Sequence, residues 1–371
     1  MNQKKILLVS RSFYPMDSPR AFRTTELAKE LSRQGHSVTV LTPSHPNHGA
    51  FARKHKLIMK DLGQPKWRRV GLKGKGLVLF IRRILRRFSN LLFEYPSLEL
   101  TFMVAKALRD EKGYDGLISI AVPYPIHWGV ARIWNKNKKG NPAKVWIADC
   151  GDPYMIQEND TFSPPFYFGW IEKWFMRKAD YISVPVETAI PAYFPEFHHK
   201  IKVIPQGFDF DEVPISSSED KNEIPYFAYA GGFIQGRRDP REFLAYLNGL
   251  KTDFRFDIFT RQKELVEPLA NLSGGRINIR DYIPRNELLE ILVQCDFLIN
   301  FENAGDRQVP SKLIDYAILD KPILSIKTGA LDSKKIDHFL NGDYSGKLLI
   351  DNPDQYRIES VVNQFIELME E

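Results

Sequence analysis

Cysteine is scarce in this chain of 371 residues. Only Cys150 and Cys295 occur, and they lie far apart in apolar surroundings. They match neither the spacing of a zinc site nor a redox motif, and two such cysteines do not make a disulfide framework. The sequence therefore predicts a protein of a reducing compartment, the cytoplasm, without a cysteine-based metal site.

Long apolar runs are also missing. No stretch reaches the roughly 18 apolar residues that a membrane-spanning helix needs. The first apolar run, residues 6–9, ends at Ser10 and Arg11, and no small-residue cleavage pattern follows it. This run predicts a buried first strand and not a signal peptide.

Acidic residues are absent from residues 62–93, which contain nine lysines and arginines. Within this segment, residues 77–93 combine arginines with apolar residues at helical spacing. Such a helix can lie in an anionic membrane interface, where each basic residue contributes about 1 kcal/mol. We therefore predict a peripheral membrane contact on the inner face of the cell membrane; the alternative is a core-packed helix with solvated arginines. The predicted contact residues are Arg82, Arg83, Arg86 and Arg87. Nucleic acid is not an expected partner, because no recognised binding module accompanies the charge.

Most of the remaining sequence alternates strand-like apolar runs with helix-like amphipathic stretches. With 43% hydrophobic and 26% charged residues, the chain is globular and long enough for two domains. Short connections between strand and helix imply parallel sheets, so the predicted fold class is α/β with two Rossmann-like, doubly wound domains facing a cleft. We assign residues 1–205 to the first domain and 206–354 to the second, with a polar, serine-rich loop at 214–225. The last helix, within 355–371, could pack on either domain, and we place it on the first.

Ligands of open α/β sheets bind at the carboxyl ends of the strands, and two loops of the second half fit such a site. The loop after the run 226–230 contains Gly232, Arg237 and Arg238, which suit a phosphate, although an ordinary glycine-rich turn is the alternative. The other loop leads into a helix that Ser311 can cap, with Lys312 at its positive end. The alternative there is a capped helix with a surface lysine.

Two polar residues follow successive strand runs of the first half. His127 comes after the run 116–120 and Asp152 after the run 144–148, so both are expected at one edge of the first sheet. A packed histidine and a turn-capping aspartate are the alternatives. The triplet Asp209-Phe210-Asp211 matches a metal-binding DxD pattern, but we interpret it as structural and predict no metal site.

Taken in order, five segments resemble the retaining GT-B glycosyltransferases of family GT4. The quoted segments are SRSFYPMDSPRAFRTTELAKELSRQGHSVTVLT, KADYISVPVETAIPAYF, KIKVIPQGFDFD, FAYAGGFIQGRRDP and CDFLINFENAGDRQVPSKLIDYAILDKPILSI. The resemblance implies a nucleotide-diphosphate-sugar donor, with UDP or GDP, on the second domain, an acceptor on the first and no cofactor or essential metal. It implies these donor contacts: Gly232, Arg237, Arg238, Ser311 and Lys312 for the diphosphate, Asp315 for the ribose, and the backbone of Tyr282 and Ile283 for the base. It implies catalytic roles for His127 and Asp152.

The chain departs from the family pattern at two places. The first glutamate of the family's paired-glutamate motif is replaced by Arg307, with Glu302 nearby. The paired glycines of the first loop are replaced by Ser18-Pro19-Arg20, so Arg20 and Arg23 are expected to meet an anionic acceptor or the donor phosphates.

The function that the resemblance implies is transfer of a hexose, with retention of configuration, to a glycan or lipid-linked glycan in surface polysaccharide biosynthesis. Two alternatives remain open from the sequence. One is a sugar-nucleotide epimerase of the same fold, and the other is a catalytically inactive scaffold.

Overall fold

The chain folds into two compact units, which the computed structural model shows as separate bodies. Unit 1 comprises Met1–Phe208 and Ile358–Glu371, and unit 2 comprises Asp209–Arg357. The first boundary lies a few residues after the predicted 205/206 division. The structure describes residues 2–72, 75–135, 137, 139–156, 164–210, 222–302, 311–350 and 352–370, without the side chains of Asn286, Ser311 and Lys312. Most of the predicted 214–225 loop, as well as Asp211 and Arg307, lies outside these residues.

A parallel sheet of seven strands forms the centre of unit 1 among the described residues, in the order β3-β2-β1-β4-β5-β6-β7. Each neighbouring pair is parallel, and the central strands are apolar along their length because both faces are covered. The strands are β1 (Lys5–Ser10), β2 (Ser37–Thr42), β3 (Ile58–Asp61), β4 (Tyr114–Ile120), β5 (Ala143–Asp149), β6 (Tyr181–Val184) and β7 (Ile201–Val203).

The first helix shows how the sequence sets these elements. The hydroxyl of Ser18 accepts a hydrogen bond from the Ala21 amide at 3.2 Å, and Pro19 occupies the first turn, where its missing N–H costs nothing. Leu27 and Leu31 then fall on one face and are buried against the sheet. Gly35 ends the helix with a φ of 90°, a conformation that favours glycine.

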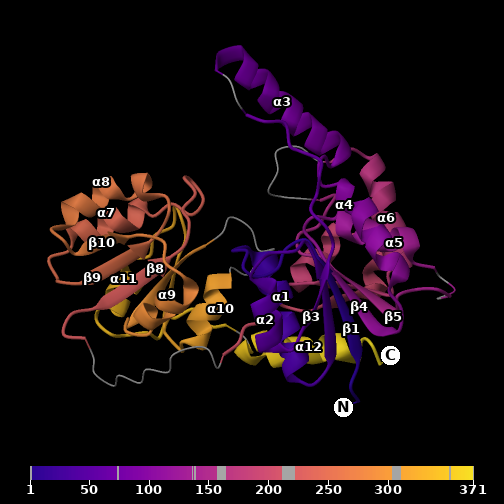
Figure 1. Cartoon of the computed structure of the whole chain (residues 1–371). Coiled ribbons are helices and arrows are strands. Elements are labelled where there is room, and N and C mark those ends of the chain that lie inside the picture. Colours follow the sequence, from indigo (N-terminus) through magenta and orange to yellow (C-terminus); the bar gives the residue numbers. More distant parts are fainter. Residues whose placement is uncertain are drawn as a thin grey trace. The chain divides into compact units, whose positions relative to one another are not determined.

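Helices cover both faces of the unit 1 sheet (Figure 1). On one face α1 packs with α2 and with the last helix, α12; on the other, α4 packs with α5 and α5 with α6. The last helix therefore belongs to unit 1. The helices are α1 (Pro19–Arg33), α2 (His48–His55), α3 (Gly76–Phe93), α4 (Glu99–Ala107), α5 (Pro125–Ile133), α6 (Tyr167–Lys178) and α12 (Ile358–Glu367).

Unit 2 repeats the architecture on a smaller scale. Its described strands form a parallel five-stranded sheet in the order β10-β9-β8-β11-β12. One apolar cluster lies under α7, α8 and α11, and another lies under α9 and α10. The elements are β8 (Tyr226–Ala230), α7 (Arg241–Gly249), β9 (Arg255–Phe259), α8 (Glu267–Ala270), β10 (Ile277–Arg280), α9 (Arg285–Leu292), β11 (Phe297–Phe301), α10 (Ser311–Ile318), β12 (Ile323–Ile326) and α11 (Ser333–Leu340). Both sheets confirm the predicted α/β fold class.

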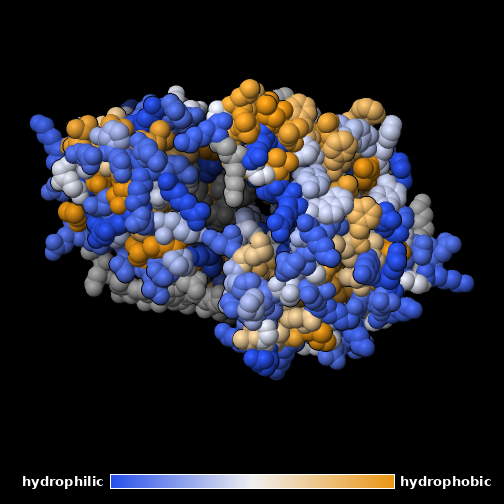
Figure 2. Space-filling model, turned by 45° about the horizontal axis from the view of Figure 1, so that its top comes forward, coloured by the Kyte–Doolittle hydropathy of each residue, from blue (hydrophilic) through white to orange (hydrophobic). Residues whose placement is uncertain are grey.

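Helix α3 differs from the other helices of unit 1 because it contains no buried residue. It extends away from the sheet of unit 1 (Figure 1). Large apolar side chains along it are exposed, among them Leu77 at 71% and Phe80 at 60%, and hydrophobic surface gathers where α3 comes forward in Figure 2. A core-packed helix, the alternative left open by the sequence, does not fit this exposure. No helix among the described residues is long and apolar enough to cross a membrane.

Candidate active site

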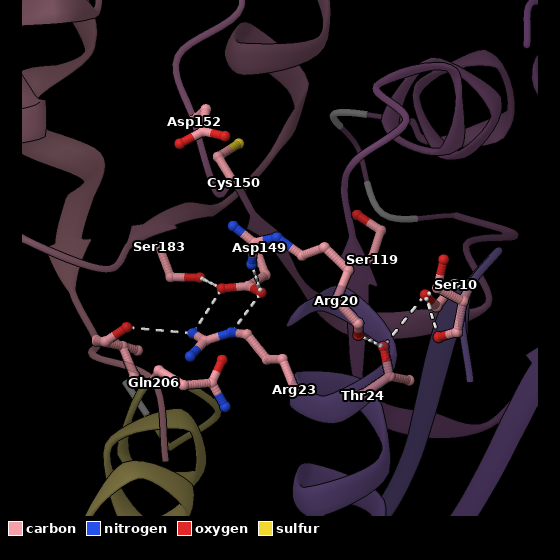
Figure 3. A network of polar contacts seen from close by, with 12 residues as sticks. Ser10, Arg20, Arg23, Thr24, Ser119, Asp149, Cys150, Asp152, Ser183 and Gln206 are labelled. Carbon is pink, nitrogen blue, oxygen red and sulfur yellow. Dashed lines mark hydrogen bonds and ion pairs between the residues drawn. The ribbon is translucent and has the colours of Figure 1, made fainter. Parts of the chain in front are cut away.

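A buried ion pair lies at the carboxyl edge of the unit 1 sheet (Figure 3). Asp149, the last residue of β5, accepts two hydrogen bonds from the Arg23 guanidinium, from Nε at 2.6 Å and from Nη2 at 2.7 Å. The Ser183 hydroxyl donates a third at 2.7 Å. These donors outweigh burial and lower the pKa of Asp149, so the carboxylate stays charged. These contacts join the ends of two strands, β5 and β6, to α1 at the edge where ligands of open sheets bind.

The second arginine of α1 is the more accessible one. Arg20 lies 3.5 Å from Asp149 and its side chain is 20% exposed, whereas Arg23 is 2% exposed. Arg23 also donates to the backbone carbonyl of Pro205 at 2.6 Å. Of the two arginines predicted to contact an anion, only Arg20 therefore has a side chain that is accessible to one. Its guanidinium lies where a Cβ at Gly151 would be, so that position admits only glycine without a shift.

His127 is fully buried in α5. Its Nδ1 lies 2.8 Å from the Ser119 hydroxyl, its Nε2 lies 3.6 Å from the Cys150 sulfur, and its ring stacks on Phe175. Burial lowers the pKa of His127 to about 3, so the imidazole is neutral. A ring in this position has no exposed surface for a sugar, and its catalytic role stays a prediction.

Asp152 lies on the loop after β5 and its side chain is exposed. The Tyr124 hydroxyl donates to its backbone carbonyl at 2.6 Å. His127 and Asp152 thus follow successive strands β4 and β5, but one is buried and the other is on the surface. Of the two, only Asp152 is accessible to a substrate in this structure.

In unit 2, the loop after β8 is built around its glycines. Gly231 has a φ of 152°, and the Gly232 carbonyl accepts a hydrogen bond from the Tyr229 hydroxyl at 2.9 Å. The Arg238 guanidinium also reaches that hydroxyl, while its Nε is buried without a partner among the described residues. Arg237 is exposed. Arg238 is therefore held beside Gly232 with donor capacity left over.

The same loop is tied to two further strands. The Asp239 amide donates to the Thr328 hydroxyl, just after β12, at 3.1 Å, and the Phe233 amide donates to Gln262 Oε1, just after β9, at 3.3 Å. Neither Thr328 nor Gln262 is among the predicted site residues. The structure thus gathers the loops after β8, β9 and β12 at one edge of the sheet.

Helix α10 begins at Ser311 beside this edge. The Tyr316 hydroxyl accepts a hydrogen bond from the Ala230 amide at 3.1 Å, which links α10 to the end of β8. The side chains of Ser311 and Lys312 lie outside the described part of the chain, so their diphosphate contacts stay predictions. Asp315, predicted to contact a ribose, is paired with Arg285, whose Nε and Nη2 donate to one carboxylate oxygen at 2.9 and 2.7 Å. Burial raises the pKa of Asp315.

The predicted base contacts follow β10, one of the two edge strands of the described unit 2 sheet. Tyr282 is 54% exposed, and the Arg261 guanidinium lies over its ring at 4.1 Å; Ile283 is half-buried. Glu302 follows β11 and accepts a hydrogen bond from the Ser325 hydroxyl at 2.9 Å. The structure therefore places a carboxylate near the carboxyl edge, without showing that it replaces the missing motif glutamate.

Solved structures share this two-sheet architecture at low sequence identity. A glycosyltransferase from Rickettsia africae has 12% identity and a TM-score of 0.66 over 100% of this chain and 98% of its own. Anabaena Alr3699/HepE in complex with UDP has 12% identity and a TM-score of 0.63 over 99% of both chains. The lipopolysaccharide outer core galactosyltransferase WaaB has 10% identity and a TM-score of 0.57 over 99% of both chains. These likenesses show the GT-B fold. Among curated proteins, none matches the sequence significantly.

The sequence itself matches a family model. Residues 22–212, just over half of the 371 residues, fit the family described as Glycosyltransferase Family 4. The match covers most of unit 1, including most of α1, the buried Asp149–Arg23 pair and α3. Together with the GT-B architecture, it shows that this chain belongs to Glycosyltransferase Family 4.

Proposed function

We propose that this glycosyltransferase transfers a hexose, with retention of configuration, from a nucleotide-diphosphate-sugar carrying UDP or GDP. The acceptor in this proposal is a glycan or lipid-linked glycan of surface polysaccharide biosynthesis. The observation that carries the proposal is the gathering of Gly232, Arg238 and the start of α10 at one edge of the unit 2 sheet. That arrangement suits the diphosphate of the donor, because backbone amides, a guanidinium and a helix N-terminus all favour phosphate.

The leaving diphosphate explains why positive groups are needed there. Negative charge grows on the leaving oxygen as the sugar departs, and fixed donors stabilise that charge. Arg238 has an uncommitted Nε, and Lys312 stands in the first turn of α10. We propose that these groups act without a metal, in which case EDTA leaves the transfer rate unchanged. A structural neighbour, Anabaena Alr3699/HepE, has been crystallised with UDP-glucose.

A donor-binding experiment tests the proposal. UDP or GDP at about 100 times its Kd should stabilise the protein by about 2.7 kcal/mol and raise its melting temperature. We expect Lys312→Ala to weaken nucleotide binding about tenfold or more, whereas the matched Lys334→Ala on α11 should not, since Lys334 is exposed on a helix of the other face. Absence of any shift with every nucleotide diphosphate would falsify the donor proposal.

Product analysis separates the alternatives. Transfer to an acceptor with the donor's anomeric configuration in the product, read by NMR, supports a retaining enzyme. Interconversion of the nucleotide sugar without an acceptor would identify an epimerase. Nucleotide binding without turnover in the presence of lipid-linked acceptors would identify a scaffold.

We also propose that α3 binds the surface of an anionic membrane. Its four arginines lie on a helix whose apolar side chains are exposed, and both kinds of group favour an interface of charged headgroups and acyl chains. The start of α6 adds two exposed aromatic residues, Phe166 at 72% and Trp170 at 67%. The intervening Tyr167 donates its hydroxyl to the Leu92 carbonyl, so these aromatic residues lie beside the end of α3. A tryptophan beside a membrane-binding helix suits the membrane interface, where tryptophan is enriched.

Sedimentation with vesicles tests the membrane proposal. The wild-type protein should pellet with phosphatidylglycerol-containing vesicles, and less so as salt rises. Changing the four α3 arginines together to serine should abolish pelleting. Undiminished pelleting of the quadruple variant would refute a role for these arginines.

A further inference from the structure

A cavity lies between α3 and the carboxyl edge of the unit 1 sheet. Its volume is about 540 Å³, which is within the range of pockets that hold small ligands. Val122, just after β4, and Tyr154, just after β5, form its inner side, and residues of α3 form the other side. The cavity therefore occupies the position at which open α/β sheets bind ligands, within a single unit of the chain.

The charges of this cavity favour an anion. Among the described residues, Arg83, Arg86 and Arg87 line it, against one carboxylate, that of Glu94. Glu94 is engaged by the Tyr154 hydroxyl, which donates to Oε2 at 3.1 Å, and burial raises its pKa. Three guanidiniums thus face this space, and the acid of the described lining, Glu94, is hydrogen-bonded to Tyr154.

Two further arginines, Arg69 and Arg11, lie near Arg86, outside the lining of this cavity. A smaller cavity joins Arg86 to Arg69. Arg11, just after β1, lies close enough to Arg69 for their repulsion to contribute to a lowered pKa of Arg11, second to burial. Arginines from three segments thus approach one another here, and an anion would relieve their repulsion.

Apart from Asn90 and two tyrosines, Tyr124 and Tyr154, the rest of the described lining is apolar. Leu72, Leu91 and Pro164 line the cavity together with Val122, and the exposed apolar side chains of α3 continue along the same helix. A free phosphate ion would use the arginines but gain nothing from these residues. A phosphate attached to a hydrocarbon chain would use both.

From this geometry we infer that the cavity binds the phosphate or diphosphate headgroup of a lipid-linked acceptor, with the lipid chain directed along α3. The inference rests on the proposed function, because it names the acceptor class of that glycosyltransferase. The arginines hold the phosphate, and the sugar or hydroxyl attached to it lies toward the loops after β4 and β5, where Asp152 is exposed. The lipid chain stays in the membrane interface that α3 contacts.

Calorimetric titration with soluble probes tests the inference without a membrane. The probe is geranyl diphosphate, compared with inorganic pyrophosphate and with geraniol, each in saturating UDP so that the donor site of unit 2 is occupied. We expect geranyl diphosphate to bind at least about tenfold more tightly than pyrophosphate, and geraniol to bind weakly or not at all.

Two matched variants locate the site. Arg83→Gln combined with Arg86→Gln should weaken geranyl diphosphate at least about tenfold, whereas Arg177→Gln, an exposed arginine in the last turn of α6, should leave it unchanged. Circular dichroism and urea denaturation of each variant report that the fold of unit 1, which contains all three arginines, is intact. Equal affinity of the double variant and the wild type overturns the inference. Equal binding of pyrophosphate and geranyl diphosphate also overturns it, because it indicates a site for a free anion.

The donor proposal can fail separately. If UDP does not bind but geranyl diphosphate does so through Arg83 and Arg86, the cavity stands and the nucleotide-sugar proposal falls. If UDP binds and geranyl diphosphate does not, the donor proposal stands and this inference falls.

Discussion

At the scale of single residues, the Asp149–Arg23 pair has the largest expected effect on stability. Asp149→Asn leaves the guanidinium of Arg23 buried without a counter-charge, and such a loss costs about 3–5 kcal/mol. The matched control is Asp115→Asn, because the Asp115–Lys144 pair lies near the surface, with the lysine 78% exposed, and is worth less than about 1 kcal/mol. Urea denaturation measures both. Equal losses of unfolding free energy in the two variants would show that the buried pair contributes no more to stability than the surface pair.

Glu172 of α6 gives the protein a predicted pH dependence. It is 1% exposed, and burial raises its pKa to about 8, against the lowering effect of the Tyr154 and Met155 amides. Between its ordinary pKa of 4.5 and about 8, the folded state holds a proton that the unfolded state has lost. The free energy of unfolding therefore falls as pH rises through this window, by up to about 1.4 kcal/mol per pH unit from this group.

Glu172→Gln keeps the shape of the side chain and replaces the carboxyl group with an amide, which does not titrate. We expect the variant to gain stability relative to the wild type as pH rises from 5 to 8, measured by urea denaturation at each pH. Parallel stability curves over that range would show that Glu172 does not titrate in this way.

The sequence did not predict which residues contact one another over long distances along the chain. Asp149 and Arg23 are separated by 126 residues, and no local spacing indicates such a pair. The family resemblance assigns Asp315 to a ribose, but the contact of Asp315 with Arg285 depends on how α9 and α10 pack. Spacing predicts the face of a helix and not what lies opposite that face.

At the scale of elements, apolar runs predicted the central strands well. Strand β8 begins and ends where the run 226–230 indicates, and β1, β4 and β5 contain the runs 6–9, 116–120 and 144–148, because strands buried on both faces are largely apolar. The edge strand β3, Ile58–Asp61, was missed, since none of its residues is buried and it has no apolar run. Helix α11 was missed for a similar reason, because only Ile336 and Phe339 are buried in it.

Helix α3 allows function and stability to be separated. Leu85 is 54% exposed, so Leu85→Ala should change the free energy of unfolding by less than about 0.5 kcal/mol. Together with Phe80→Ala, however, it should weaken binding to anionic vesicles. The contrasting variant is Leu100→Ala in α4, which should cost about 2–5 kcal/mol because Leu100 is 1% exposed. A large loss of stability from Leu85→Ala would mean that α3 packs against the fold in solution.

At the scale of the whole molecule, each unit contains one buried cysteine. Cys150 lies in unit 1 and Cys295 in unit 2, both with 0% exposure. Burial raises the pKa of both thiols, that of Cys295 to about 12, so each reacts only when its own unit opens. Thiol labelling followed by mass spectrometry therefore reads the stability of the two units separately.

UDP should slow the labelling of Cys295 and leave that of Cys150 nearly unchanged, if the nucleotide binds unit 2 alone. The expected slowing is about 100-fold at 100 times Kd, when labelling follows the equilibrium opening. Equal protection of both cysteines would indicate that the units open together, and protection of Cys150 alone would place the nucleotide on unit 1.

The return of the chain to unit 1 through α12 has a consequence for biosynthesis. Val361 and Phe365 of α12 are buried in the same apolar cluster as Leu8 of β1 and Leu27 of α1. The ribosome synthesises β1 and α1 before unit 2, and α12 only after all of unit 2 has been translated. The apolar surface of unit 1 that α12 covers therefore stays exposed until α12 has been synthesised. We expect chaperones to bind nascent unit 1 during this interval.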